Sequence, residues 1–329
     1  MKLTFKDVGQ GDSILLEWED GDQRKIGIID CNRKYGKNPV LEHIEAEKYK
    51  EIEFIILSHP HTDHYSGMTE LLTWIAKEGI IVKSFGHTVH LLASDYYKYL
   101  NGLEAGTKAK GELQKMFDKV DELVKSEIIK KIDFIIEGTV RDLTDEVRMK
   151  CLSPSKTEAE IYMKDVDLQP VKNPTKASAS ANHLSTMFKI TIGDNYYLLT
   201  SDSECVTFAR LMKENIHVNL QKKHLKIAQV PHHGAFVNYH APFWDFVTRS
   251  DKPQAAISAG LHETYKHPHL PVLKAFNNQG YDIHCTNIVY GMIEFADYLN
   301  ELAELTNKLD TFTEVVASNT GGDKFFDLI

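Results

Sequence analysis

The chain has 329 residues, of which 42% are apolar and 26% charged, and its formal net charge at pH 7 is −9. This apolar content is sufficient for a buried core and excludes a wholly disordered chain. The negative charge argues against a long basic surface that grips duplex nucleic acid through many phosphates.

The first part of the chain is predicted to start with strands, because short apolar runs alternate with glycine turn signals. A helix follows, and then a short apolar run that fits a buried strand and ends directly in a histidine-rich loop. The predicted strands are Leu3–Phe5, Ser13–Glu17, Lys25–Asp30 and Phe54–Leu57, and the predicted helices are Val40–Lys50 and Met68–Lys77.

The stretch from about residue 85 to 165 differs in character. Apolar side chains recur there at steps of three and four from Leu113 to Ile128, which indicates a long amphipathic helix. We predict a helical insertion or lid over the strand framework, with a helix that faces the core as the alternative.

Strands return in the second half and are followed by helices. The predicted strands are Val147–Leu152, Met187–Ile192, Tyr196–Leu199, Ile227–Val230, Ala255–Ser258, Asp282–Cys285 and Met292–Phe295, and the predicted helices are Glu204–Asn215 and Pro271–Gln279. Two packed sheets with helices outside, of the α/β (α+β) class, fit this order. We place the main domain at residues 1–296 and a C-terminal helix and tail at 297–329, and we expect the stretch Ala317–Lys324 to be loosely held.

The segment Ser58–Gly67, with the sequence SHPHTDHYSG, carries the strongest chemical signal. Side chains two residues apart in an extended chain point the same way, so His59 and His61 can bind one metal together. Asp63 and His64 follow where the chain turns into the next helix, and their side chains can reach a second metal. Imidazole and carboxylate ligands suit zinc, and also iron or manganese. The alternative is a polar surface loop.

This HPHTDH segment resembles the HxHxDH signature of the metallo-β-lactamase superfamily. Three further segments resemble the hydrolase domain of bacterial DNA-uptake (competence) channel proteins and its stand-alone soluble relatives: DVGQGDS (Asp7–Ser13), the strand end Ile29–Asp30, and VPHHG (Val230–Gly234). The resemblance implies a four-layer αββα sandwich interrupted by the helical insertion. It also implies an edge site for two divalent metal ions, zinc first, with manganese or iron as alternatives.

By the same resemblance, Asp202 bridges both metals, although a helix N-cap is the alternative reading of this residue. Serine stands at position 201, where relatives usually have glycine. His233 is predicted to close the second metal site, with His232 as an electrostatic helper, and the reverse assignment stays open. His183 is the candidate third ligand of the first metal, or else a loop residue.

His267 resembles a His-Pro pair that occurs late in these relatives, where a histidine contacts a substrate phosphate or protonates the leaving group. A plain loop residue is the alternative. Asp30 is expected to orient a ligand histidine. The predicted catalytic residues are therefore Asp63, His232 and His267.

The resemblance implies a di-metal hydrolase in which the cations activate a water molecule. A phosphodiesterase or nuclease is the first candidate, acting on a small-molecule or nucleic-acid phosphodiester. A basic groove leading from the metals would favour nucleic acid. The candidate basic residues for it, which are otherwise ordinary solvated surface, are Lys108, Lys110, Lys172, Lys176, Lys222 and Lys223. An ester, thioester or lactone hydrolase is the second candidate. A metal-binding interaction module with weak catalysis is a third, of another class.

The location of the chain is predicted from what the sequence lacks. No segment approaches the roughly 18 apolar residues of a membrane span, and the N-terminus lacks the apolar run of a signal peptide. The four cysteines lie far apart without a CxxC pair, which suggests neither disulfides nor a thiolate metal site. We expect a cytoplasmic protein.

Overall fold

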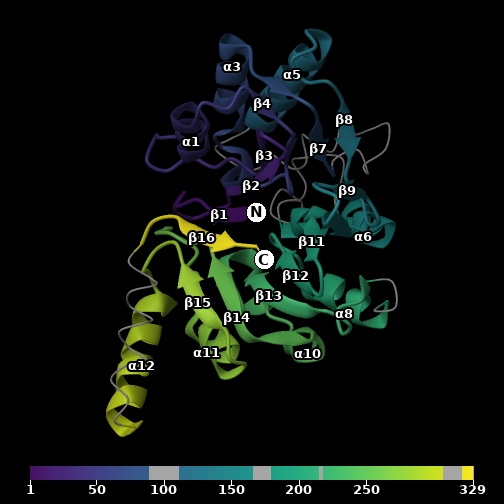
Figure 1. The fold of residues 1–329 in the computed structure, drawn as a ribbon. Helices are drawn as coiled ribbons and strands as arrows, with labels where there is room; N and C mark the ends of the chain where they lie inside the picture. Colours follow the sequence, from purple (N-terminus) through teal and green to yellow (C-terminus); the bar gives the residue numbers. More distant parts are fainter. Residues whose placement is uncertain (89–110, 166–178, 215–217, 307–320, 329) are drawn as a thin grey trace.

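Two large β-sheets stack face to face, and helices cover both outer faces (Figure 1). The structure is a computed structural model that describes residues 1–88, 111–165, 179–214, 218–306 and 321–328. The predicted α/β class and the four-layer αββα sandwich are thereby confirmed.

The first sheet has seven strands in the order β16-β1-β2-β3-β5-β7-β8. The strands from β16 to β3 pair antiparallel, whereas β3, β5, β7 and β8 run parallel. The bounds are β1 Lys2–Phe5, β2 Ile14–Asp20, β3 Gln23–Ile29, β5 Phe54–Ile56, β7 Phe85–His87, β8 Ile132–Phe134 and β16 Lys324–Asp327.

The second sheet repeats this division between antiparallel and parallel pairing. Its seven strands follow the order β15-β14-β13-β12-β11-β10-β9, with β12 to β15 parallel and the rest antiparallel. The bounds are β9 Val140–Asp142, β10 Val147–Ser153, β11 Met187–Ile192, β12 Asn195–Leu199, β13 His224–Gln229, β14 Arg249–Ile257 and β15 Asp282–Cys285. A separate pair joins β4 Glu51–Ile52 to β6 Ile81–Val82.

Three apolar cores hold the four layers together. Strand β2 illustrates the pattern, because Leu16 and Trp18 point into the core between the sheets while Leu15 points to the outer core under the helices. Helices α1 Pro39–Glu47, α3 Met68–Glu78 and α5 Glu112–Lys125 cover the first sheet, and α8 Cys205–Lys213, α10 Ala241–Phe246, α11 Leu270–Asn278 and α12 Gly291–Thr306 cover the second.

The stretch predicted as a helical insertion is not purely helical. It contains α5 and α6 Lys156–Asp165, but it also supplies β7 and β8 to the first sheet and β9 and β10 to the second. Leu113, Met116 and Val120 of α5 are buried in the outer core of the first sheet. The structure therefore favours the alternative of a helix that faces the core.

One expectation for the end of the chain was wrong. Residues Met292–Phe295, predicted as a strand, lie in α12, where Met292 and Phe295 pack on the second sheet at helical spacing. The stretch Ala317–Lys324, expected to be loosely held, lies partly outside the described residues, and β16, which begins at its last residue, pairs with β1 over four residues. The domain limits at 296 and 297 stay predictions.

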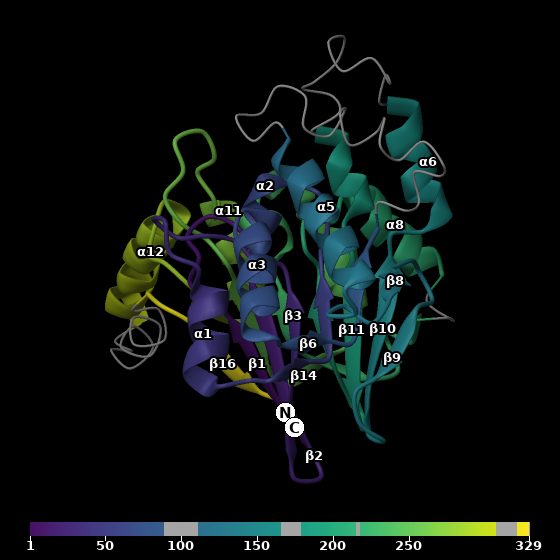
Figure 2. The ribbon, with the colours of Figure 1, turned by 90° about the horizontal axis from the view of Figure 1, so that it is seen from above.

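The carboxyl ends of the parallel strands all meet at one edge of the sandwich. The short helix α2 Thr62–Tyr65 marks this edge in Figure 2, and the two chain termini lie at the opposite edge. Ligands of open α/β sheets bind at the carboxyl ends of the strands, so this edge is where a site is expected. Within the described residues, no helix combines the length and apolar character needed to cross a bilayer.

Candidate metal centre

The loop after β5 carries four of the predicted ligands to this edge. His61 is extended (φ −97°, ψ 146°) and forms the N-cap of α2, on which Asp63 and His64 lie. The neighbouring loop of residues 9–12 packs closely against it, because a Cβ on Gly11 would lie 2.2 Å from the Asp63 carbonyl oxygen. The DVGQGDS segment thus needs glycine at this position, where φ is +125°.

A first cluster consists of His59, His61 and Asp202, whose potential ligand atoms lie within 4.8 Å of one another. His59 Nε2 is 3.1 Å from His61 Nδ1 and 3.5 Å from Asp202 Oδ2. His59 is fully buried at the end of β5, whereas Asp202 follows β12 of the other sheet. The two sheets therefore contribute jointly to this cluster.

A second cluster consists of Asp63, His64 and His233, again within 4.8 Å. His233 Nε2 lies 3.4 Å from Asp63 Oδ2, and His64 Nε2 lies 3.9 Å from Asp63 Oδ1. Asp202 reaches this cluster too, with Oδ2 at 3.6 Å from His64 Nε2 and Oδ1 at 3.6 Å from His233 Nε2. Asp202 thus lies between the two clusters.

These separations fit a pair of cations better than hydrogen bonds. His64 Nε2, His233 Nε2 and Asp202 Oδ1 are buried and have no hydrogen-bond partner among the described residues. Two ligand atoms that are each about 2.1 Å from a tetrahedral cation stand about 3.4 Å apart. Because buried polar atoms are otherwise satisfied, the unpartnered set suits metal ligation.

The opposite ring nitrogens of the histidines are held by the protein. His64 Nδ1 lies 2.7 Å from Asp30 Oδ2, and Asp30 also accepts hydrogen bonds from the Ser58 amide and hydroxyl at 2.7 and 2.6 Å. His233 Nδ1 donates to the Ser258 carbonyl oxygen at 2.9 Å. Both rings thereby present Nε2 to the second cluster, as metal-binding histidines do. Asp30 lies where an orienting residue was expected.

The electrostatics of the buried groups follow from their mutual contacts. Burial alone lowers the pKa of His64, but the carboxylates of Asp30, Asp202 and Asp63 outweigh it and hold this pKa well above the usual value. Burial likewise opposes the charge of His233, and Asp202 and Asp63 still raise its pKa to about 9. In Asp202, burial raises the pKa, but the surrounding imidazoles hold it well below its usual range. A divalent cation would replace protons here.

The two adjacent histidines of the VPHHG segment are placed differently. Both have positive φ, 48° for His232 and 56° for His233, in the turn Pro231–Gly234. His233 is buried in the second cluster, whereas the His232 side chain is 23% exposed. His232 Nε2 lies 3.4 Å from Asp202 Oδ2, and its Nδ1 lies 3.0 Å from Asn238 Oδ1. This placement favours His233 as the ligand and His232 at the open side.

His267 adjoins His232, with 5.4 Å between the ring centroids. It is buried, and its Nδ1 has no hydrogen-bond partner among the described residues. Burial and the neighbouring imidazoles of His232 and His233 lower its pKa to about 3. Its loop packs on the VPHHG turn, since a Cβ on Gly234 would lie 2.6 Å from Pro268 Cβ.

His183 lies in the short turn Ala181–Leu184 and belongs to neither cluster. Its neighbour Asn182 donates to Glu204 Oε1 at 3.0 Å. Within the described residues, His183 therefore does not complete the first cluster at the 4.8 Å spacing. Its role as third ligand stays a prediction.

Sequence reasoning missed Gln229, which links two loops of the site. Gln229, at the end of β13, accepts hydrogen bonds from the amides of Thr200 and Ser201 at 2.9 and 3.0 Å. Its side-chain amide donates to Asp12 Oδ2 at 2.7 Å. One buried side chain thus joins the Asp202 turn to the loop of residues 9–12. Its position directly before VPHHG was the available signal.

Exposed apolar side chains occur in two loops that also carry residues of the site. Phe236 and Val237, just after the VPHHG segment, are 57% and 77% exposed, and Leu261 and Tyr265, after β14, are 68% and 53% exposed. Of the six lysines considered for a basic groove, Lys222 and Lys223 precede β13 and so lie at its far end from His232. The other four lie outside the described residues.

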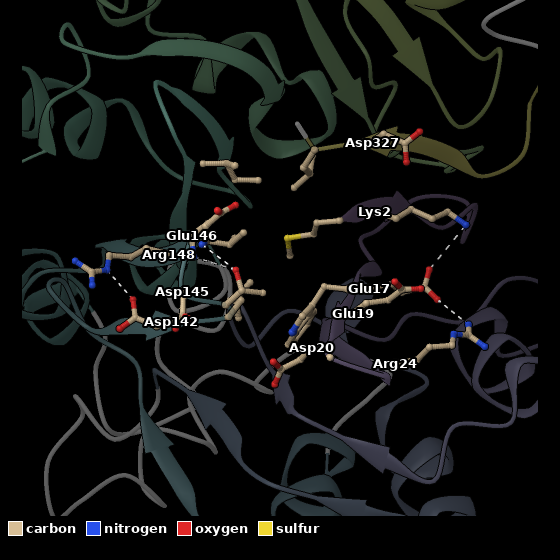
Figure 3. Close-up of a pocket in the computed structure, with 18 of the residues that line it drawn as sticks. Lys2, Glu17, Glu19, Asp20, Arg24, Asp142, Asp145, Glu146, Arg148 and Asp327 are labelled. Atoms are coloured by element: carbon tan, nitrogen blue, oxygen red, sulfur yellow. Dashed lines mark hydrogen bonds and ion pairs between the residues drawn. The ribbon is translucent and has the colours of Figure 1, made fainter.

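A spacious cavity lies elsewhere on the molecule. A cavity of about 1270 Å³ opens at the opposite edge, between the β2–β3 turn and the segment of residues 142–148 (Figure 3). Its acidic side chains face basic ones, as where Glu17 lies 3.9 Å from Lys2 and 4.0 Å from Arg24. None of the predicted site residues lines it.

Comparisons with known proteins bear on the fold only. No protein-family model and no curated protein matches the chain. Among solved structures, it is similar to the metallo-β-lactamase-fold protein YhfI from Bacillus subtilis (12% identity, 86% of this chain and 95% of that one, TM-score 0.42). A putative metal-dependent hydrolase from Parabacteroides distasonis gives 12% identity over 86% and 92%, with a TM-score of 0.42.

A third similar structure is CmlA, a diiron β-hydroxylase from Streptomyces venezuelae, at 10% identity and a TM-score of 0.43. The match covers 99% of this chain but only 54% of CmlA, so the chain spans about half the length of that protein. One fold hosts many activities, so function has to be argued from the site itself. The narrower likeness to competence-channel hydrolase domains stays a prediction.

Proposed function

We propose that this chain is a di-metal hydrolase that cleaves phosphodiesters. One observation carries the proposal: the buried Asp202 carboxylate lies 3.4–3.6 Å from four imidazoles, between the two clusters, and His64 Nε2, His233 Nε2 and Asp202 Oδ1 have no hydrogen-bond partner among the described residues. Two divalent cations held there would lower the pKa of a bound water and stabilise charge on both the attacking and the leaving oxygen of a phosphodiester.

The two clusters would each hold one cation. His59, His61 and Asp202 would hold one cation, and Asp63, His64, His233 and Asp202 the other. His183 remains the candidate third ligand of the first. Zinc suits these donors, with manganese or iron as alternatives.

Asp63, His232 and the buried His267, which adjoins His232, would act on the substrate. The Asp63 side chain is 36% exposed, so its carboxylate can accept a proton from the attacking water. His232 and His267 would donate hydrogen bonds to the substrate oxygens and assist the departing group.

A second candidate is hydrolysis of an ester, thioester or lactone. The exposed Phe236, Val237, Leu261 and Tyr265 beside the site favour it, because an apolar rim suits an acyl chain better than a phosphate backbone. The position of Lys222 and Lys223 at the far end of β13 gives a long nucleic acid no added support. A small phosphodiester is compatible with both the exposed apolar side chains and the distant position of these lysines, and it is therefore our first choice.

The test pairs metal analysis with a substrate panel. We expect two cations per purified chain and turnover of bis-p-nitrophenyl phosphate that is lost in Asp63→Ala. Asp145→Ala, which changes a carboxylate in the cavity at the opposite edge, is the matched control and should keep full activity. Turnover of p-nitrophenyl esters alone would replace the phosphodiester assignment by the second candidate. Two bound cations without turnover of any substrate would point to a metal-binding interaction module.

A further inference from the structure

The turn that carries Asp202 has an unusual residue before it. Ser201 has a φ of +47°, in the left-handed region that favours glycine. It is 5% exposed, and Gln229 fixes its amide at 3.0 Å. A serine in this conformation is disfavoured unless its side chain makes a compensating contact.

The Ser201 hydroxyl makes two contacts inside the site. It donates to the Ser58 hydroxyl oxygen at 2.9 Å and lies 3.2 Å from His59 Nδ1. Ser58 in turn donates to Asp30 Oδ2 at 2.6 Å, the same oxygen that His64 Nδ1 contacts at 2.7 Å. Two hydroxyls therefore connect His59 of the first cluster to the carboxylate that holds His64 of the second.

Counting the protons in this series of hydrogen bonds, from Asp30 through Ser58 and Ser201 to His59, fixes the tautomer of His59. Each serine has one hydroxyl proton. Ser58 gives its proton to Asp30, and Ser201 gives its proton to Ser58. The Ser201 oxygen, at 3.2 Å, and the Ser58 oxygen, at 3.3 Å, can then only accept from His59, so His59 Nδ1 carries a proton. The unprotonated Nε2 faces His61 and Asp202, at 3.1 and 3.5 Å.

We infer that Ser201 is a positioning residue, whose hydroxyl holds His59 in the tautomer and ring orientation that bind a cation in the first cluster. This inference rests on the proposed metal centre but not on the choice of substrate. Asp30 then orients one histidine of each cluster, His64 directly and His59 through Ser58 and Ser201. The contact explains why serine occupies a position that suits glycine.

Two substitutions separate the hydroxyl from the backbone conformation. Ser201→Gly removes the hydroxyl and relieves the left-handed strain, so this variant should fold at least as well as the wild type. Ser201→Ala removes the hydroxyl and keeps the strain. Ser203→Ala is the matched control, because Ser203 is buried in the same turn and donates to the Thr200 carbonyl oxygen rather than to a ring.

The measurement is zinc affinity of the purified chain by competition with a chromophoric chelator, together with the absorption spectrum of the cobalt(II)-substituted protein. In both Ser201 variants we expect one of two zinc equivalents to bind about 10-fold more weakly, the low end for loss of a ligand-orienting partner. The cobalt spectrum should change in both, and Ser203→Ala should match the wild type. Thermal unfolding of the metal-free proteins should rank glycine above alanine.

The possible failures are distinguishable. If Ser201→Gly binds two zinc ions as tightly as the wild type, with an unchanged cobalt spectrum, the positioning role is overturned and the proposed function stands. If the wild type binds no cation, the metal centre itself is contradicted, and the role of Ser201 falls with it.

Discussion

The two edges of the sandwich both gather charged side chains, but in opposite ways. At the strand ends that carry Asp202, carboxylates and imidazoles are buried and several lack hydrogen-bond partners among the described residues. At the other edge, acidic side chains line a cavity of about 1270 Å³ and pair with Lys2, Arg24 and Arg148 (Figure 3). The proposed metal centre therefore rests on buried ligand atoms without hydrogen-bond partners, and cavity size does not support it.

The largest expected contrast between the edges is in activity. Asp202→Asn removes the negative charge shared by the two clusters, and we expect phosphodiester turnover to fall by at least about 10²- to 10³-fold. Steady-state assays at saturating zinc measure it. Asp145→Asn in the cavity should stay within about twofold of the wild type. An Asp202→Asn enzyme with a tenth of the original activity or more would show that the carboxylate is not central.

The second expected contrast is in thermal stability, because removal of metal should affect variants at the two edges differently. A ligand that binds only the native state stabilises it, by about 4 kcal/mol at a concentration 1,000 times Kd. We expect a chelator to lower the Tm by about 10 °C, which differential scanning calorimetry measures. Asp145→Asn should show the same shift, and His64→Ala a much smaller one. A Tm that is unchanged by added zinc and by the chelator would contradict the metal centre.

The buried pair of Asp30 and His64 provides a third contrast. Asp30→Ala leaves a fully buried imidazole without its nearest carboxylate, and breaking such a pair costs about 3–5 kcal/mol. Urea unfolding of the metal-free protein measures this loss. The matched change Asp142→Ala breaks the exposed contact with Arg148 at the cavity, and we expect no measurable effect. Equal losses in the two variants would remove the distinction between the edges.

The smallest expected effect concerns Glu17 at the cavity and depends on pH. Burial raises the pKa of Glu17, but hydrogen bonds from His43 and Tyr49 outweigh it and the pKa is lowered. A lowered carboxyl pKa stabilises the folded state above the unfolded value of about 4.3, and this contribution is lost as pH falls through the folded value.

Glu17→Gln should therefore cost about 1 kcal/mol or less at pH 7, after screening by solvent. The difference from the wild type should vanish near pH 3, as urea titrations at both pH values can measure. Glu19→Gln, on the exposed part of the same strand, serves as the control. A Glu17→Gln difference that is equal at both pH values would exclude titration of this carboxyl as the cause.

The sequence could predict what depends on local spacing. The HPHTDH segment follows a short apolar strand, so its four ligand candidates were evident, and the helical spacing of α3 and α5 was equally clear. The prediction of a strand at Met292–Phe295 was wrong because a short apolar run fits either a strand or a buried helix. The three-residue strands β7 to β9 are too short to carry a period-two pattern.

The contacts that complete the site could not be predicted from local patterns. Ser201 meets Ser58 across 143 residues of sequence, and Gln229 meets Asp12 across 217. No periodicity encodes such a pairing, because it depends on how two sheets stack. Asp202 and His233 were found only through the resemblance of their segments to a known family.

The pairing of β1 with β16 has a consequence for how the chain reaches its native state. Lys2 pairs with Asp327, and the Leu328 amide donates to the Met1 carbonyl oxygen. One side of β1 therefore pairs only after β16, which lies more than 300 residues later in the sequence, has been synthesised. Contacts between such distant residues form slowly, and an open strand edge invites pairing with other chains. Association of nascent chains through this edge is thus the misfolding hazard that the topology creates.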